Sequence, residues 1–186
     1  MSNSTNQNGW DLGRNLIEKI VTVWAETKKI PVDYENVPES FQLKKAREKN
    51  KEVYLRTTII DTGTNQAELG ECGLAKHTCV GQVDLFVPKN SGTKRARDLL
   101  NDLMRVFRIA NTLDSVKKRS VQIRQPAMTQ GSLQDEVYMM SMQIPIEFVI
   151  FMNLESAILD DTDFAANIGD ELRSFIWDED GYNEDA

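Results

Sequence analysis

The chain has 186 residues, 40% of them hydrophobic, which is enough for one domain with a real core plus extensions. It contains no long apolar run and opens on the polar, uncharged stretch MSNSTNQNGW, so we expect neither a membrane span nor a signal peptide. The two cysteines, Cys72 and Cys79, fit a reducing compartment such as the cytosol and do not suggest a disulfide scaffold.

Charge is distributed unevenly along the chain. The net charge is −7, but residues 153–186 hold eleven acidic residues and one basic residue, Arg173. That segment therefore carries −10 and the remainder +3. A mildly basic body with an acidic C-terminal arm lacks the strongly basic face of a protein that grips DNA by its phosphates.

The N-terminal part predicts a disordered lead followed by a helix. Residues 1–9 are polar and are expected to be disordered. From residue 12 to 27, apolar residues recur at steps of three and four, which is typical of an amphipathic helix. We expect Trp24 in this helix to anchor the core, with a hydrogen-bond partner for its indole N–H.

A charge-dense segment at 44–51 comes next. It contains Lys44, Lys45, Arg47, Lys49 and Lys51. A basic run can bind nucleic acid, which is the alternative interpretation. However, acidic residues accompany it and no aromatic residues interleave it, so we expect a solvated loop.

The centre of the chain predicts strands leading into a second helix. Residues 53–60 (VYLRTTII) and 76–87 have the composition or alternation of strands, with a loop or hairpin tip over 61–71. The isolated Gly81 suggests a bulge in the second strand. After Pro88 and a polar turn, a helix with one apolar face should begin near Thr93, a possible N-cap, and continue to Phe107.

Two further strands complete the predicted fold. Residues 120–125 alternate, 127–134 should form a loop, and 136–151 form the longest strand candidate, with an apolar face at its even positions. Pro145 suggests an edge position or a bulge in that strand. We therefore expect an α+β domain over residues 10–152, with a mostly antiparallel sheet of four or five strands and two helices on one face.

The C-terminal extension, residues 153–186, predicts an amphipathic helix at about 161–177 followed by an acidic coil. Such a helix can pack on its own domain, pack on a neighbouring chain, or remain disordered until a partner binds. We expect it to contact a partner or a neighbouring subunit, because the pattern is that of a helix-in-groove anchor. The expected interface residues are Phe164, Ile168, Leu172, Phe175, Ile176 and Trp177.

A metal site is one candidate for chemistry. Cys72, His77 and Cys79 lie close in sequence with Glu71 beside them, but they lack a C-x2-C knuckle and a second ligand pair for zinc. Asp61, Glu68, Glu71 and Asp84 lack the specific spacing of a two-metal nuclease. We therefore expect no metal and no cofactor.

His77 is the only histidine available for acid–base catalysis at neutral pH, and a serine or cysteine triad would have to use it. No G-x-S-x-G elbow, P-loop or G-x-G-x-x-G motif accompanies it. An enzyme that uses His77 is thus the minority hypothesis, and we expect no catalytic residues.

Several short stretches, in a particular order and spacing from Leu12 to Phe151, together carry a resemblance. The chain resembles the tail terminator-like proteins of tailed bacteriophages, although the charged insertion at 44–51 looks longer than usual and the acidic arm looks like an addition. The stretches are Val23-Trp24-Ala25, Tyr34-Glu35-Asn36-Val37-Pro38, Tyr54-Leu55-Arg56, Gly81-Gln82-Val83-Asp84-Leu85-Phe86-Val87-Pro88, Gly92-Thr93, Ala96-Arg97 and Ile144-Pro145-Ile146.

The resemblance implies a structural virion protein without catalysis. Members of the family have a small α+β fold and form a hexameric ring that caps the head-proximal end of the tail tube. The ring joins the tube to the head-completion proteins (stopper or connector), and genomic DNA passes through its lumen without specific binding. The resemblance thus places the chain in the tail or neck of the virion, assembled in the host cytoplasm, with no membrane partner.

Overall fold

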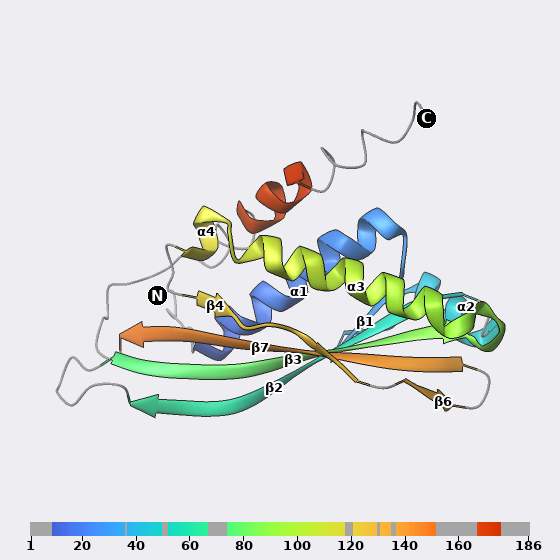
Figure 1. Ribbon diagram of the computed structural model, residues 1–186, viewed down its shortest axis with the longest axis horizontal. Coiled ribbons are helices and arrows are strands. Elements are labelled where there is room, and N and C mark those ends of the chain that lie inside the picture. The colour runs from blue at the N-terminus through green and yellow to red at the C-terminus, as the bar shows by residue number, and fades with distance from the viewer. Residues whose placement is uncertain are drawn as a thin grey trace, which may run out of the picture.

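Three long strands form the centre of the fold, as their alternating apolar residues predict. The computed structural model describes residues 9–35, 37–49, 52–66, 74–117, 121–129, 131–134, 137–151 and 167–175. Strands β2 (Tyr54–Gln66), β3 (Leu74–Pro88) and β7 (Val137–Phe151) pair antiparallel with one another, with β3 in the middle. Figure 1 shows them as a long, twisted ribbon beneath the helices.

Four short strands flank this ribbon. The strand β1 (Val32–Tyr34) pairs parallel with β2 on one side. On the other side β4 (Val121–Ile123), β5 (Ala127–Met128) and β6 (Ser132–Gln134) pair in succession with β7. The main path is β1-β2-β3-β7-β4. The α+β class and the mostly antiparallel sheet are confirmed, while the described residues form seven strands where four or five were expected, because the segment at 127–134 forms two short strands.

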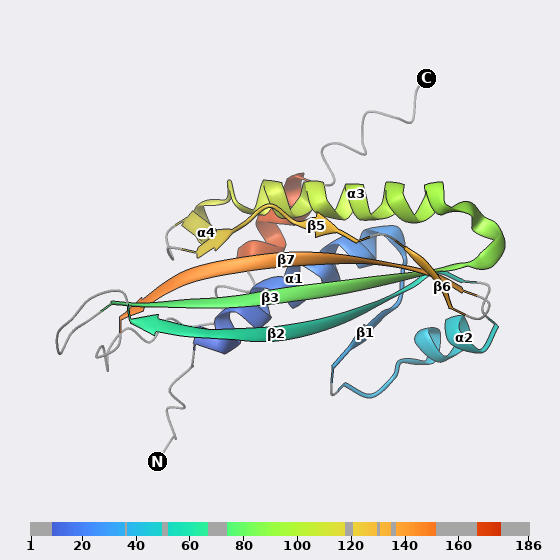
Figure 2. The same cartoon turned by 60° about the horizontal axis from the view of Figure 1, so that its bottom comes forward.

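Helices α1 (Gly9–Lys28) and α3 (Gly92–Ala110) cover one face of the sheet (Figures 1 and 2). The odd-numbered residues of β3 from 77 to 87 and the even-numbered residues of β7 from 140 to 148 face these helices and are buried, as the alternation predicted. The buried side chains of this core include Leu16, Ile20, Leu85, Leu100, Phe107, Ile144 and Phe148.

Trp24 links the two helices at the centre of this core. Its side chain is fully buried, and its Nε1–H donates to Asp102 Oδ2 on α3 at 2.8 Å. Lys28 Nζ lies 3.2 Å from the same carboxylate oxygen. The expected anchor with a hydrogen-bonded indole is confirmed.

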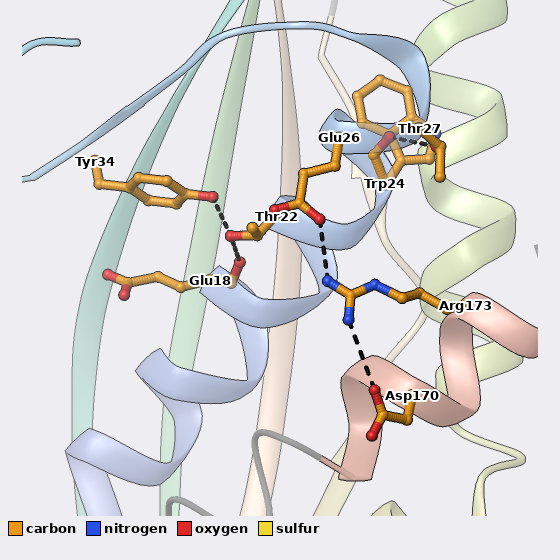
Figure 3. Close-up of polar contacts among 8 residues, drawn as sticks. All are labelled: Glu18, Thr22, Trp24, Glu26, Thr27, Tyr34, Asp170 and Arg173. Carbon is orange, nitrogen blue, oxygen red and sulfur yellow. Dashed lines mark hydrogen bonds and ion pairs between the residues drawn. The ribbon is translucent and has the colours of Figure 1, made fainter.

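Helix α1 is also tied to β1 (Figure 3). The Tyr34 hydroxyl lies 2.5 Å from Thr22 Oγ1, which itself donates to the Glu18 carbonyl at 2.6 Å. The tyrosine therefore acts as the donor, since the threonine proton is already used. Burial raises the pKa of Tyr34 above 10.0, so the hydroxyl keeps its proton at neutral pH.

The loop expected at 44–51 is wrong for its first part, because α2 (Phe41–Lys49) is a helix. It packs on the opposite face of the sheet from α1 and α3 (Figure 2). Leu43 and Ala46 are buried there against Tyr54 and Phe86, whose rings stack at 4.5 Å. Ser40 Oγ accepts a hydrogen bond from the Leu43 N–H at 3.1 Å and so caps the first turn.

The bulge expected at Gly81 is also wrong. Gly81 pairs in regular register with both Ile59 and Ile144. A Cβ on this glycine would lie 2.7 Å from Ile17 Cδ1 of α1. The absence of a side chain at Gly81 therefore allows the helix to pack close to the sheet. The irregularity lies instead in β2 between Asp61 and Gly63, where Gly63 has a φ of 118° that favours glycine.

Pro145 lies inside β7, in regular register opposite Val80, and occupies neither an edge strand nor a bulge. Its carbonyl accepts from the Arg124 N–H at 2.8 Å, on the side of β7 that faces β4 and β5. The missing N–H of the proline points to the same side, because both backbone groups of a residue share a direction in a strand. This missing N–H faces the gap between β4 and β5, so the proline costs the sheet no backbone hydrogen bond.

The turn before α3 is a 3-10 helix over Lys89–Ser91, and Ser91, not Thr93, occupies the N-cap position. At the other end of α3, α4 (Asp114–Lys117) leads into β4. No described helix is long and apolar enough to cross a membrane.

A last helix, residues 167–175, packs on α1 and α4 of its own chain. Arg173 Nη2 lies 3.2 Å from Glu26 Oε2, and its Nη1 lies 3.6 Å from Asp170 (Figure 3). Ser115 Oγ donates to Glu171 Oε2 at 3.2 Å. The remainder of the helix expected at 161–177 lies outside the described residues, as do residues 1–8 of the expected lead and the predicted domain boundary at 152, which stay predictions. The lead was expected to include Gly9, which instead begins α1.

Candidate assembly surfaces

His77 and Cys79 lie on the helix-facing side of β3, where both are buried. Cys79 sits under Gly13 of α1, and burial, reinforced by the nearby Asp61 carboxylate, raises the pKa of its thiol to about 11. A thiol that keeps its proton at neutral pH is a poor nucleophile and a poor metal ligand. Among the described residues no group of three His, Cys, Asp or Glu side chains could hold a metal ion, while Glu71 and Cys72 lie outside them.

The candidate carboxylates of a two-metal site do not converge within the described part of the chain. Asp61 lies 3.4 Å from His77 Nε2, next to the helix-facing side of the sheet. Asp84 lies on the opposite face, where Ser141 Oγ donates to its Oδ1 at 2.5 Å and Gln82 Nε2 donates at 3.0 Å. Glu68 lies outside the described residues.

The sheet face away from α1 and α3 is partly open. Helix α2 covers one end of it, and the remainder carries polar side chains together with the exposed Ile60 and Val149. On this face Glu147 bridges two strands, with Arg124 Nη2 at 2.7 Å and Lys76 Nζ at 2.9 Å. The hydrogen bond from Arg124, followed by that from Lys76, lowers the pKa of Glu147. One carboxylate thus compensates part of the charge of two cations on this face.

The two edges of the sheet differ. At β4 the side-chain amide of Asn111, just after α3, bonds to both backbone groups of Ile123 and so occupies the edge. At β2 the neighbour β1 pairs only with Leu55–Thr57. The outer side of β2 from Thr58 to Gln66 therefore has no strand neighbour within the described residues. An open strand edge is a template for pairing with another chain.

Helix α2 presents an exposed surface that we name the α2 patch: Val37, Phe41, Lys44 and Lys45. Phe41 is 81% exposed, the largest value among the described large hydrophobic residues, and Val37, just before the helix, is 53% exposed. Arg47 of the same helix is not part of the patch, because it pairs with Asp33 and Glu39 and lies 5.5 Å from the Tyr54 ring centroid. The patch thus combines an exposed aromatic ring with two exposed ammonium groups.

The six interface residues expected in the C-terminal helix divide into three groups. Ile168 and Leu172 are fully buried in the core of their own chain. Phe175 is 48% exposed. Phe164, Ile176 and Trp177 lie outside the described residues. The interface stays a prediction, and Phe175 is its one exposed member within the described part.

Sequence reasoning missed Phe41 and Asn111. The step of three from Leu43 to Ala46 is a signal that could have identified the helix and placed Phe41 on its outer side. No local signal relates Asn111 to Ile123, because that contact depends on how the chain returns after α4.

Comparisons with known proteins identify a family and a similar fold. A family model described as "Phage tail terminator protein" matches residues 14–148. A solved structure whose name states no function is similar in fold, with a TM-score of 0.52 and 18% sequence identity over 74% of this chain and 94% of the other. No curated protein matches the chain by sequence.

Proposed function

Because the chain belongs to the phage tail terminator family, and is therefore a structural virion protein that contacts other tail components, we propose that it forms a ring. The ring is hexameric and caps the head-proximal end of the tail tube, where it stops polymerisation. It joins the tube to the head-completion protein, and genomic DNA passes through its lumen. The family match over residues 14–148 is the observation that carries the proposal.

Two unlike sheet edges support a ring. A ring built head to tail uses heterologous interfaces, in which each subunit contributes two different surfaces. The open edge of β2 supplies one surface, whereas Asn111 blocks the equivalent edge at β4. A chain with two open edges would pair in several ways, so the block restricts the modes of assembly.

The charge of the sheet face suits a channel that DNA traverses. Each phosphate contact with a lysine or arginine adds affinity, so a lumen that releases DNA avoids uncompensated positive charge. On the open sheet face Glu147 pairs with both Lys76 and Arg124 and so reduces their combined charge from +2 to +1. We propose that this face lines the lumen, because part of its positive charge is compensated.

The role requires no catalysis, and its assembly takes place in the host cytoplasm. On this account His77 is a packing residue, in contact with the Phe148 ring at a centroid distance of 4.9 Å. His77→Ala should then alter stability and leave tail assembly intact at permissive temperature.

A capping assay tests the proposal. Purified tail tube protein is polymerised with and without the chain, and tube lengths are measured by electron microscopy. We expect the chain to shorten the tubes and to appear at one end of each. Unchanged tube lengths with no end density would contradict the proposal.

A matched pair of variants tests the role of the β2 edge. Ile60→Lys places a charge on the open edge strand, where lysine discourages pairing. Gln143→Lys adds the same charge to the same face, but in β7, which has neighbours on both sides. Ile60→Lys should abolish capping, whereas Gln143→Lys should retain it. Equal capping activity of the two variants would show that the edge of β2 is not part of the subunit interface.

A second candidate function, nucleic-acid binding, rests on the exposed Lys44 and Lys45 of α2. It predicts an affinity for DNA that falls steeply as salt is raised, and a double Lys→Glu variant that loses this affinity. Absence of salt-dependent DNA binding by the isolated chain would eliminate it.

A further inference from the structure

The α2 patch is exposed to an unusual degree for its composition. Phenylalanine is normally buried, and an aromatic ring that is 81% exposed, with the exposed Val37 four residues earlier in the chain, marks an interaction surface. The side of α2 that carries Phe41 lies opposite Leu43 and Ala46, the residues that bury the helix. The patch therefore points away from its own domain.

Two lysines define the charge of the partner. Lys44 and Lys45 follow Phe41 by three and four residues and so share its side of the helix. Lys45 lies 3.7 Å from Glu52, but both side chains are about half exposed, so that pair is weak. Glu48, about one turn after Lys44, lies on the same side of the helix and adds one negative charge there. An occupant of the patch should present an apolar side chain followed by several carboxylates.

The chain itself contains a segment of that description. Residues 176–186 read IWDEDGYNEDA, in which Ile176 and Trp177 precede five acidic residues and no basic one. The segment follows the helix at 167–175 and lies outside the described residues. Aromatic residues, tryptophan and tyrosine above all, dominate the energetics of protein interfaces.

We propose that residues 176–186 of one subunit dock on the α2 patch of a neighbouring subunit, with Trp177 against Phe41 and the acidic residues beside Lys44 and Lys45. This inference rests on the proposed ring, because it needs a neighbour of the same kind. The family match covers residues 14–148, so residues 176–186 lie outside it. The proposal therefore adds a contact between subunits that a ring formed by the matched residues alone does not require.

The geometry of one subunit favours docking on a neighbour. The helix at 167–175 packs on α1, on one side of the sheet, whereas α2 lies on the other side (Figures 1 and 2). A segment of eleven residues spans at most about 40 Å when fully extended. Within one subunit it would have to pass around a sheet edge to reach α2. A neighbour in a ring can present α2 directly.

Zero-length crosslinking of the full chain tests the proposal. Subunits of two isotopic compositions are mixed and reassembled, treated with a carbodiimide that joins lysine to carboxylate, and analysed by mass spectrometry. We expect mixed-isotope crosslinks between Lys44 or Lys45 and the carboxylates of residues 178–185. Mixed isotopes show that the two peptides come from different subunits.

Two matched variants separate docking from folding. Phe41→Ser removes the aromatic ring and retains both lysines, so the mixed crosslinks should fall about tenfold if the ring is an anchor of the contact. Gln42→Ser, at the next exposed position of α2, should leave them unchanged. Equal crosslinking in the two variants would overturn the proposal.

The outcomes distinguish this inference from the proposed function. Intact rings with crosslinks confined to single subunits, or with none at Lys44 and Lys45, would overturn the docking and leave the ring in place. Protection of these lysines by DNA or by tube protein, and not by the arm, would overturn it as well. A strictly monomeric chain would overturn the ring and the docking together.

Discussion

The side-chain amide of Asn111 takes the place of a strand neighbour beside Ile123. Its Nδ2–H donates to the Ile123 carbonyl at 2.5 Å, and its Oδ1 accepts from the Ile123 N–H at 2.9 Å. One residue at the end of α3 thus satisfies two backbone groups that an edge strand would leave open. The edge is thus blocked at Ile123, whereas the outer side of β2 from Thr58 to Gln66 has no strand neighbour in the described part of the chain, an asymmetry that suits head-to-tail assembly.

Replacing Asn111 by leucine should destabilise the protein. The Ile123 backbone groups would lose their partners, and we expect the free energy of unfolding to fall by about 1–3 kcal/mol. Asn101→Leu is the matched control, because Asn101 is exposed on the same helix. Urea unfolding measures both, and an equal loss in the two variants would refute the assigned role.

The hydrogen bond between Trp24 and Asp102 should contribute to stability through a buried donor. Asp102→Ala leaves the indole N–H unpaired, and we expect a loss of about 1–3 kcal/mol in the free energy of unfolding. Asp98→Ala, one turn earlier on α3 and exposed, should cost much less. In a Trp24→Phe background, which lacks the donor, Asp102→Ala should cost less than in the native chain. Additive losses would show that the two residues are not coupled.

Gly81→Ala should be costly although alanine suits a strand better than glycine. The new Cβ would lie 2.7 Å from Ile17 Cδ1 and 3.1 Å from Ile17 Cγ2, in a fully buried site. Overpacking of this kind costs about 1–3 kcal/mol. Ile17→Val removes the nearest methyl group, so Gly81→Ala should cost less in that background. A neutral or stabilising Gly81→Ala would contradict the close approach of α1.

The Cys79 thiol should make stability fall at high pH. Its pKa is about 11 in the folded chain against a usual value of 9.0. Between these values the unfolded chain has lost a proton that the folded chain retains, so raising the pH favours unfolding. This contribution is fully present below pH 9.0 and is lost by about pH 11. The slope of stability against pH in this window should be shallower in Cys79→Ala than in the native chain.

Thiol labelling gives an independent check of the same residue. In a Cys72→Ala chain, Cys79 is the only thiol, and it should react with a thiol reagent at neutral pH only after unfolding. Rapid labelling of the folded Cys72→Ala chain would contradict the burial of Cys79 under Gly13.

The strands β3 and β7 and the helices α1 and α3 could be predicted from the sequence, because each shows an apolar pattern that spans many residues and reflects one buried face. It failed at α2, where only Leu43 and Ala46 mark the buried side and five nearby cations obscure them. Gly81 was misinterpreted because a glycine in a strand fits a bulge as well as a close approach. Only the position of Ile17, far away in sequence, decides between them.

The candidate site was harder to predict than the fold. Periodicity identifies which side of a helix is buried, but it does not say which exposed residues are grouped into a surface. The open edge of β2 depends on where its neighbour β1 ends, at Tyr34, and the α2 patch depends on which side of α2 packs on the sheet. Ile168 and Leu172 of the C-terminal helix belong to the expected apolar stripe, but both are buried in the core of their own chain.

The most direct test of the ring is the mass of the full chain in solution, measured by native mass spectrometry alone and with tail tube protein. The account predicts a species of six times 21.2 kDa in at least one of these conditions. A strict monomer of 21.2 kDa in both conditions would contradict it.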